Sequence, residues 1–255
     1  MPIMIACFKW VIDEAYILRG ASRELDFSLV DYKISDYDRN AIEEAVRLKE
    51  DLGGSVIGVT VGVSEATKGV KDALSRGSDQ VYFIADPSFN DLEPAQTAFL
   101  LAEAIRSRIT DYDLILCGEG SSDLYAQQVG PRLAEHLGIS CLSFVRKLTL
   151  EGSHVMAERW MGEGTEVVTA PLPAVVTVLP EINVPRIPGV KDTLMASGKP
   201  VVVLKKEDLA AVGQGHLQII GLTAARMDRK CEMFGTGADE IARFMESLRK
   251  KGVTD

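Results

Sequence analysis

Blocks of apolar residues alternate with blocks of mixed apolar and polar residues along the first part of the chain. Four short apolar runs have the length of buried strands: residues 3–8, 55–61, 80–84 and 114–117. Apolar positions at helical spacing occupy four longer intervals: residues 38–52, 65–74, 92–107 and 129–137. This alternation predicts an α/β fold, namely a doubly wound, mostly parallel sheet with helices on both faces.

The pattern changes after Gly138. Three short β-like runs with glycines between them predict a β-hairpin extension along one edge of the sheet: residues 141–150, 154–160 and 166–169. Two further strands are predicted over 172–179 and 201–204, and a predicted terminal helix covers 238–250. That helix carries an apolar stripe of Ile241, Phe244, Met245 and Leu248. Such a stripe either docks on a partner or packs back on its own domain, and the pattern leaves both open.

The stretch 113–138 carries the clearest candidate chemistry. A short apolar run leads into a loop of small residues, 118–123, and a helix follows. The glycines let a ligand approach the backbone, and Ser121, Ser122 or Asp123 can cap the helix. Because a helix start offers unpaired N–H groups and a positive dipole end, a nucleotide phosphate at this loop is one interpretation. The other is an ordinary strand-to-helix turn, since the loop is neither a Walker motif nor a GxGxxG motif.

The net charge and the cysteine positions limit the partners and the compartment that we expect for this protein. A formal net charge of −9 argues against nucleic acid or an anionic membrane as a partner. The cysteines lie far apart without a CxxC motif, which predicts buried free thiols in a reducing compartment: Cys7, Cys117, Cys141 and Cys231. No apolar run approaches the roughly 20 residues of a spanning helix, and the N-terminus is typical of a first strand. We therefore expect a cytoplasmic protein without membrane insertion.

Catalytic motifs are missing from the sequence. There is no GxSxG or HExxH pattern, and His136 and His154 fall where structural or solvated roles are expected. Neither a metal site nor a catalytic acid/base pair is predicted. These features favour a cofactor carrier over a hydrolase, because a bound cofactor brings its own chemistry. Whether the protein turns over a substrate of its own stays open.

Six segments, in order along residues 3–204, resemble the β subunit of electron-transfer flavoprotein. They are AIEEAVRLK (41–49), VTVG (59–62), ALSRGSD (73–79), DLILCG (113–118), AQQVGP (126–131) and LPAVVT (172–177). Three segments resemble in particular the Fix-type subfamily, which is associated with carnitine-related reduction and nitrogen fixation. They are KISDYD (33–38), DALSRG (72–77) and GEGSSDLYAQQVG (118–130).

This resemblance implies a heterodimer with an α subunit. An FAD bound mainly by the α subunit is expected to exchange electrons with acyl-CoA dehydrogenases. The β subunit of the family holds a nucleotide of its own, AMP in conventional members and a second FAD in electron-bifurcating members. Residues 1–204 are expected to form the nucleotide-binding domain, including a partner-recognition loop over 181–200. Residues 205–255 are expected to form an arm and helix that dock on the α subunit.

The resemblance also implies the residues of two sites. The expected cofactor-binding residues are Cys7, Phe8, Lys9, Val61, Gly62, Gly118, Gly120, Ser121, Ser122, Asp123, Ala126, Gln127, Gln128, Val129 and Gly130. The loop that grips the dehydrogenase in the family corresponds to residues 187–194, with Val190 as its aliphatic anchor. The expected partner-binding residues are Ile187, Val190, Lys191 and Leu194.

The chain also departs from the family pattern. Many relatives have Asn-Pro where this chain has Ser35-Asp36, and bifurcating relatives have Asp and Thr where it has Tyr125 and Ala126. The choice between AMP and a second FAD therefore stays open. Two rival classes remain, a nucleotide-binding regulatory protein of the universal-stress type and a nucleotide-dependent enzyme such as an adenylating hydrolase. The long tail argues against the first, and the lack of a phosphate-gripping lysine in the loop 118–123 argues against the second.

Overall fold

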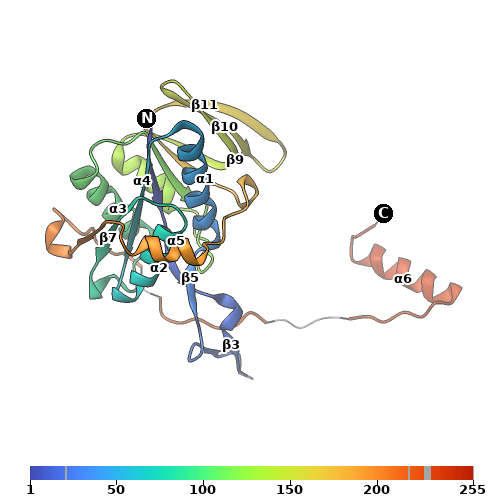
Figure 1. Ribbon diagram of the computed structural model, residues 1–255. Coiled ribbons are helices and arrows are strands. Elements are labelled where there is room, and N and C mark those ends of the chain that lie inside the picture. Colours follow the sequence, from blue (N-terminus) through green and yellow to red (C-terminus); the bar gives the residue numbers. More distant parts are fainter. Residues whose placement is uncertain (21, 218, 227–230, 255) are drawn as a thin grey trace. The chain divides into compact units, whose positions relative to one another are not determined.

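The computed structural model describes residues 1–20, 22–217, 219–226 and 231–254 (Figure 1). Its strands are β1 (Ile3–Cys7), β2 (Trp10–Ile12), β3 (Leu18–Arg19), β4 (Leu25–Asp26), β5 (Tyr32–Ile34), β6 (Ser55–Gly62), β7 (Gln80–Ala85), β8 (Leu114–Gly118), β9 (Ser140–Glu151), β10 (His154–Trp160), β11 (Thr165–Pro171), β12 (Ala174–Val178) and β13 (Val201–Leu204). Its α-helices are α1 (Asp36–Leu52), α2 (Thr67–Ser75), α3 (Pro94–Arg108), α4 (Val129–Leu137), α5 (Val190–Ala196) and α6 (Ala238–Lys250).

Among the described residues, nine strands form one large sheet in the order β11-β10-β9-β12-β8-β1-β6-β7-β13. Each neighbouring pair from β9 to β13 in this order is parallel. Strand β10 runs antiparallel to both β9 and β11 and makes the hairpin extension at one edge. The predicted α/β fold with a mostly parallel sheet and edge hairpins is therefore confirmed.

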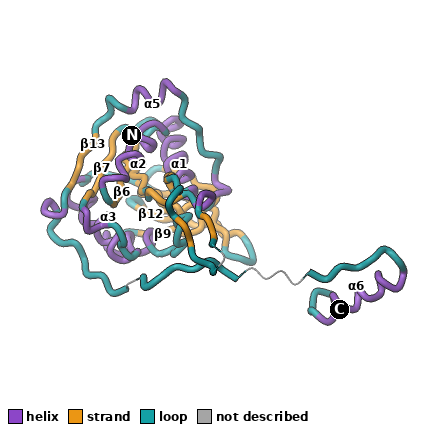
Figure 2. Tube along the Cα trace, turned by 90° about the horizontal axis from the view of Figure 1, so that it is seen from below, coloured by secondary structure: helices purple, strands orange, loops and turns teal. Residues whose placement is uncertain are grey.

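Helices cover both faces of this sheet, as Figure 2 shows. Side chains of a strand alternate between the two faces, so Met4 and Ala6 of β1 pack with residues of α1 and α2. Ile5 and Cys7 of the same strand pack with residues of α3 and α4 on the opposite face. The strands β1, β8 and β12 are buried on both faces, which explains their continuous apolar runs.

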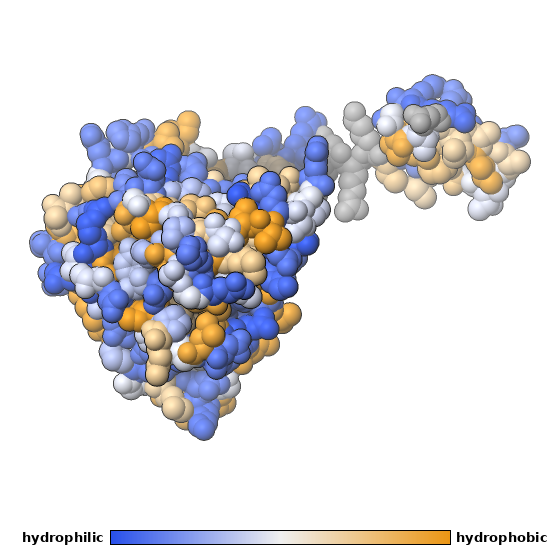
Figure 3. Space-filling model, turned by 90° about the horizontal axis from the view of Figure 1, so that it is seen from above, coloured by the Kyte–Doolittle hydropathy of each residue, from blue (hydrophilic) through white to orange (hydrophobic). Residues whose placement is uncertain are grey.

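The chain divides into two compact units, each described here by itself. The larger comprises residues 1–18 and 26–220 and contains the nine-stranded sheet. The smaller comprises residues 19–25 and 221–255 and contains α6, whose bounds agree with the helix predicted over 238–250. Ile241, Phe244 and Met245 of α6 stay exposed, and Figure 3 shows apolar residues gathered along one side of this part.

Two of the four predicted buried thiols are fully buried. Cys7 and Cys117 lie in the core, Cys141 is half-buried, and all four thiols are free. The prediction is wrong for Cys231, which is exposed because it lies in the smaller unit, outside the packed sheet and its helices. Within the described residues, no helix is both long enough and apolar enough to cross a membrane.

Candidate functional site

The chain changes direction across the sheet between β1 and β8. From β1 it continues to β6 and β7 on one side, whereas β8 pairs with the other side of β1 and leads towards β12. A switch point of this kind leaves a crevice beyond the carboxyl ends of the two strands, where open α/β sheets bind ligands. A cleft of about 640 Å³, counted with its open mouth, lies at this place.

Most of the residues predicted to bind a cofactor line this cleft. They are Cys7, Phe8, Lys9, Gly118, Gly120, Ser121, Ala126, Gln127, Gln128 and Val129. Other residues of the lining were not among those predicted: Asp38, Pro94, Thr97, Leu101, Cys117, Glu119 and Leu124. Three of the latter belong to α3, which reaches the cleft by packing across the sheet. No local pattern in α3 marks these three residues, because their residue types are equally expected in any helix that packs on the core.

Asp38 lies near the start of helix α1 without being its N-cap residue. Helix α1 already begins at Asp36 with Ser35 as its N-cap residue, so Asp38 lies inside the first turn and is buried. Its carboxylate accepts hydrogen bonds from the backbone N–H of Lys9 at 2.8 Å and of Gly118 at 3.1 Å. Asp38 therefore ties the ends of β1 and β8 together at the floor of the cleft.

Asp38 should make the stability of the protein depend on pH. Burial raises the pKa of its carboxyl from 3.8 to about 7, against the opposing effect of the two amide donors. Between these values the folded protein keeps a proton that the unfolded chain has released, so the free energy of unfolding falls as the pH rises. In the wild type, we expect the free energy of unfolding to fall by a few kcal/mol between about pH 4 and about pH 8. Asp38→Asn does not titrate, so this fall should be absent in the variant. Urea unfolding across this range measures the slope, and an unchanged slope in the variant contradicts the assignment.

The predicted capping of α4 by Ser121, Ser122 or Asp123 is wrong, because α4 begins only at Val129. Ser122 instead contacts α1: its hydroxyl accepts from the N–H of Asp36 at 3.0 Å, and its own N–H donates to Ser35 Oγ at 3.2 Å. Asp123 pairs with Lys9, with 2.5 Å between Lys9 Nζ and Asp123 Oδ2. These loop residues therefore brace α1 and the end of β1.

Tyr125 helps to fix the shape of the loop between β8 and α4. Its φ of 46° and the φ of 56° at Gln127 lie in the left-handed region, which side chains of this kind rarely adopt. The Tyr125 hydroxyl donates to the Glu119 carboxylate, and its ring centroid lies 5.2 Å from that of Tyr37. The bond to Glu119 raises the pKa of Tyr125 to about 12. These contacts hold the strained backbone in place against its conformational cost.

The N-terminus of α4 opens onto the cleft, since Gln128 and Val129 belong to the cleft lining. In the described part of the chain, the N-cap residue Gln128 makes no capping bond with its side chain, which instead accepts from Arg132 Nε at 3.0 Å. The N–H groups of Val129 and Gly130 are thus left without a side-chain cap and can meet an anion, whereas Pro131 has no N–H and that of Arg132 donates to the Gln128 carbonyl. Lys9, also in the lining, adds a positive charge that Asp123 partly offsets.

Five predicted contact residues lie outside the described cleft lining: Val61, Gly62, Ser122, Asp123 and Gly130. Val61 and Gly62 end strand β6, one strand away from the switch point. Gly130 is buried where α4 meets β12, and a Cβ there would lie 2.3 Å from Thr177 Cγ2. Its lack of a side chain therefore serves the packing of α4 on the sheet.

Gly118 is required for the floor of the cleft to close. A Cβ at this position would lie 2.6 Å from Tyr37 Cβ and 2.7 Å from Asp38 Oδ1. We expect Gly118→Ala to lower the free energy of unfolding by roughly 1–3 kcal/mol, because backbone of α1 must move to admit the methyl group. Gly164→Ala is the matched control, since a Cβ there meets nothing within 4 Å. Equal denaturant midpoints for the two variants would refute this reading.

The residues predicted to bind a partner protein lie in one exposed segment. Ile187 is 92% exposed, Val190 80% and Leu194 71%, and Lys191 between them is also exposed. Val190 is the first residue of helix α5, and its exposure places it outside the protein's own core. Three large apolar side chains are therefore presented to solvent within eight residues of each other.

A parallel α/β sheet with a partly apolar cleft and an open helix N-terminus at its switch point is an arrangement in which proteins bind small ligands. The family model described as "Electron transfer flavoprotein domain" matches residues 26–209, well over half of the chain. The chain therefore belongs to the electron transfer flavoprotein domain family. The resemblance found in the sequence is therefore confirmed for the electron transfer flavoprotein family as a whole.

Proposed function

We propose that the chain is the β subunit of a heterodimeric electron transfer flavoprotein. An FAD held mainly by the α subunit exchanges electrons with a partner of the acyl-CoA dehydrogenase type. The present chain holds AMP, or a second FAD, in the cleft between β1 and β8. The observation that carries this proposal is the cleft itself, at the switch point of a chain whose family is that of electron transfer flavoproteins.

The cleft lining fits both parts of an adenine nucleotide. Leu101, Leu124 and Val129 give it apolar walls suited to a flat ring. The ammonium of Lys9 and the amides at the start of α4 give it a cationic end suited to a phosphate. Glycine and alanine positions in the loop keep side chains out of the way of the ligand. A flavin supplies the electron transfer when bound, and the residues of this chain bind and orient the nucleotide.

Two surfaces support the proposed partners. The exposed apolar segment 187–194 is assigned to the dehydrogenase, because buried apolar anchors dominate many interfaces. The arm 205–255, with the exposed stripe of α6, is assigned to the α subunit. An amphipathic helix whose apolar side chains stay exposed gains stability by covering them.

Calorimetric titration of the purified full chain with AMP, FAD and ATP tests the nucleotide assignment. Saturable binding of AMP or of FAD supports it, and the ligand that binds more tightly decides between the conventional and the bifurcating form. Binding of ATP alone favours the rival class of universal-stress-type proteins. Binding of none of the three overturns the assignment of the cleft.

A further inference from the structure

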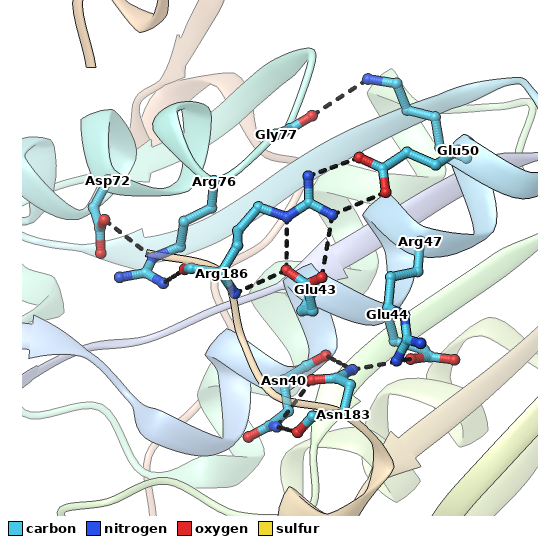
Figure 4. A network of polar contacts seen from close by, with 11 residues as sticks. Asn40, Glu43, Glu44, Arg47, Glu50, Asp72, Arg76, Gly77, Asn183 and Arg186 are labelled. Atoms are coloured by element: carbon cyan, nitrogen blue, oxygen red, sulfur yellow. Dashed lines mark hydrogen bonds and ion pairs between the residues drawn. The ribbon is translucent and has the colours of Figure 1, made fainter. Parts of the chain in front are cut away.

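A polar network fastens the chain just before the exposed segment to helix α1 (Figure 4). The guanidinium of Arg186 binds Glu43 through Nε at 2.8 Å and Nη2 at 3.1 Å, and Glu50 through Nη1 at 2.7 Å and Nη2 at 3.0 Å. The backbone N–H of Arg186 also donates to Glu43 at 3.1 Å. Arginine alone among side chains offers a rigid fork that can engage two carboxylates in this way.

Two further residues, Asn183 and Arg76, extend this network. Asn183 donates from Nδ2 to the carbonyl of Asn40 at 3.0 Å and to Glu44 at 2.9 Å, and it accepts from Asn40 Nδ2 at 3.0 Å. Arg76, the C-cap residue of α2, donates to the carbonyl of Arg186 at 2.9 Å. Residues 183–186 are thereby joined to both helices that cover one face of the sheet.

The other end of the exposed segment is also fixed. The ammonium of Lys199 donates to the carbonyls of Leu74 and Ser78, at 2.8 and 2.7 Å, where α2 ends. Ala196, the last residue of α5, is buried in the core shared with α2. The apolar side chains of residues 187–195 thus stand on a short span whose two ends are both anchored.

We infer that Arg186 is a positioning residue, which holds residues 187–195 in the shape that a partner protein recognises. The inference rests on the proposed function in one respect, that this segment docks the dehydrogenase. A segment ordered before binding loses less conformational entropy on binding. The ion pairs of Arg186 with Glu43 and Glu50 form a clamp on the segment. Glu43 is almost fully buried and Glu50 is exposed, so salt screens the Arg186–Glu43 pair only weakly.

Proteolysis of the full chain tests the clamp without any partner. Lys191 is exposed, but cleavage after it by endoproteinase Lys-C requires local opening of α5. We expect Arg186→Gln to speed this cleavage on the order of tenfold, because local opening of the segment costs less free energy once the bonds of Arg186 to Glu43 and Glu50 are lost. Arg186→Lys, which keeps the charge without the fork, should fall between. Arg47→Gln is the control, since Arg47 lies on α1, the helix that carries Glu43 and Glu50, and pairs weakly with Glu44 at 4.0 Å.

A double-mutant cycle tests whether the clamp serves docking. Arg186→Gln and Val190→Ala should each weaken affinity for the dehydrogenase, and their effects should be non-additive because both act through one surface. Nucleotide content should stay unchanged. Equal cleavage of wild type and Arg186→Gln overturns the clamp. Faster cleavage with unchanged or purely additive affinity losses overturns the link to docking. If the wild type binds no dehydrogenase, the proposed function fails, while the cleavage rates still decide the clamp.

Discussion

Val190→Asp should weaken binding of the proposed acyl-CoA dehydrogenase partner by roughly tenfold to a hundredfold while the chain stays folded. Val190 is 80% exposed, so the substitution disturbs no core packing in this chain. In the docked complex, however, a carboxylate at an apolar anchor must lose its water without gaining a partner. The effect should therefore appear in the affinity for the dehydrogenase and not in the unfolding free energy.

Steady-state electron transfer at varied dehydrogenase concentration measures this effect. The FAD content and the flavin reduction potential should match those of the wild type, since the segment acts in docking. Val167→Asp is a matched control, because Val167 is also exposed but lies on the edge hairpin. An unchanged apparent affinity in Val190→Asp, with the fold intact, would show that the segment 187–194 is not the docking site.

Ala126→Asp should empty the cleft of the proposed nucleotide. Ala126 belongs to the cleft lining, close in sequence to the open start of α4. A carboxylate here competes with a phosphate for the same amides and repels it, which we expect to weaken binding by at least about tenfold. Ala210→Asp adds the same charge at an exposed position away from the cleft and should change nothing. Nucleotide released on denaturation of each variant is the measurement, and undiminished content in Ala126→Asp argues against the phosphate position.

The regular elements follow from local pattern because burial acts on short stretches of chain. The run predicted over 3–8 is β1 at Ile3–Cys7, and the helix predicted over 238–250 is α6. Short-range periodicity reports which side of an element faces apolar surroundings, and this information is complete within about a dozen residues. The position of the cleft also follows, since it depends on strand order and on the ends of two buried strands.

The roles of single polar residues could not be predicted, because their partners are distant in sequence. Asp38 binds the amides of Lys9 and Gly118, which are 29 and 80 positions away. Ser122 meets the amide of Asp36 at a separation of 86 positions. A serine or aspartate near a helix start is typical of a cap to that helix, and only the folded chain shows which helix it serves.

The cap of α4 was mispredicted for a local reason, although the apolar spacing over 129–137 matches the bounds of that helix. Gly118 to Asp123 look like a complete turn, so a cap is expected within this loop, directly before the helix. Instead the chain passes through left-handed conformations at Tyr125 and Gln127, which neither residue type favours. The contacts of Tyr125 with Glu119 and Tyr37 stabilise this path, and such contacts leave no signal in periodicity.

The cofactor content of the purified complex decides whether this chain is a nucleotide-bearing β subunit. The chain is co-expressed with an α-type electron transfer flavoprotein subunit, the complex is purified, and FAD and AMP are counted after denaturation. We predict a stable heterodimer with a flavin spectrum. Each heterodimer should contain either one FAD and one AMP or two FAD. With Ala126→Asp, the nucleotide of this chain should be lost while the FAD of the α subunit remains. A chain that stays alone, or a heterodimer with FAD in the α subunit and no second nucleotide, would contradict the claim.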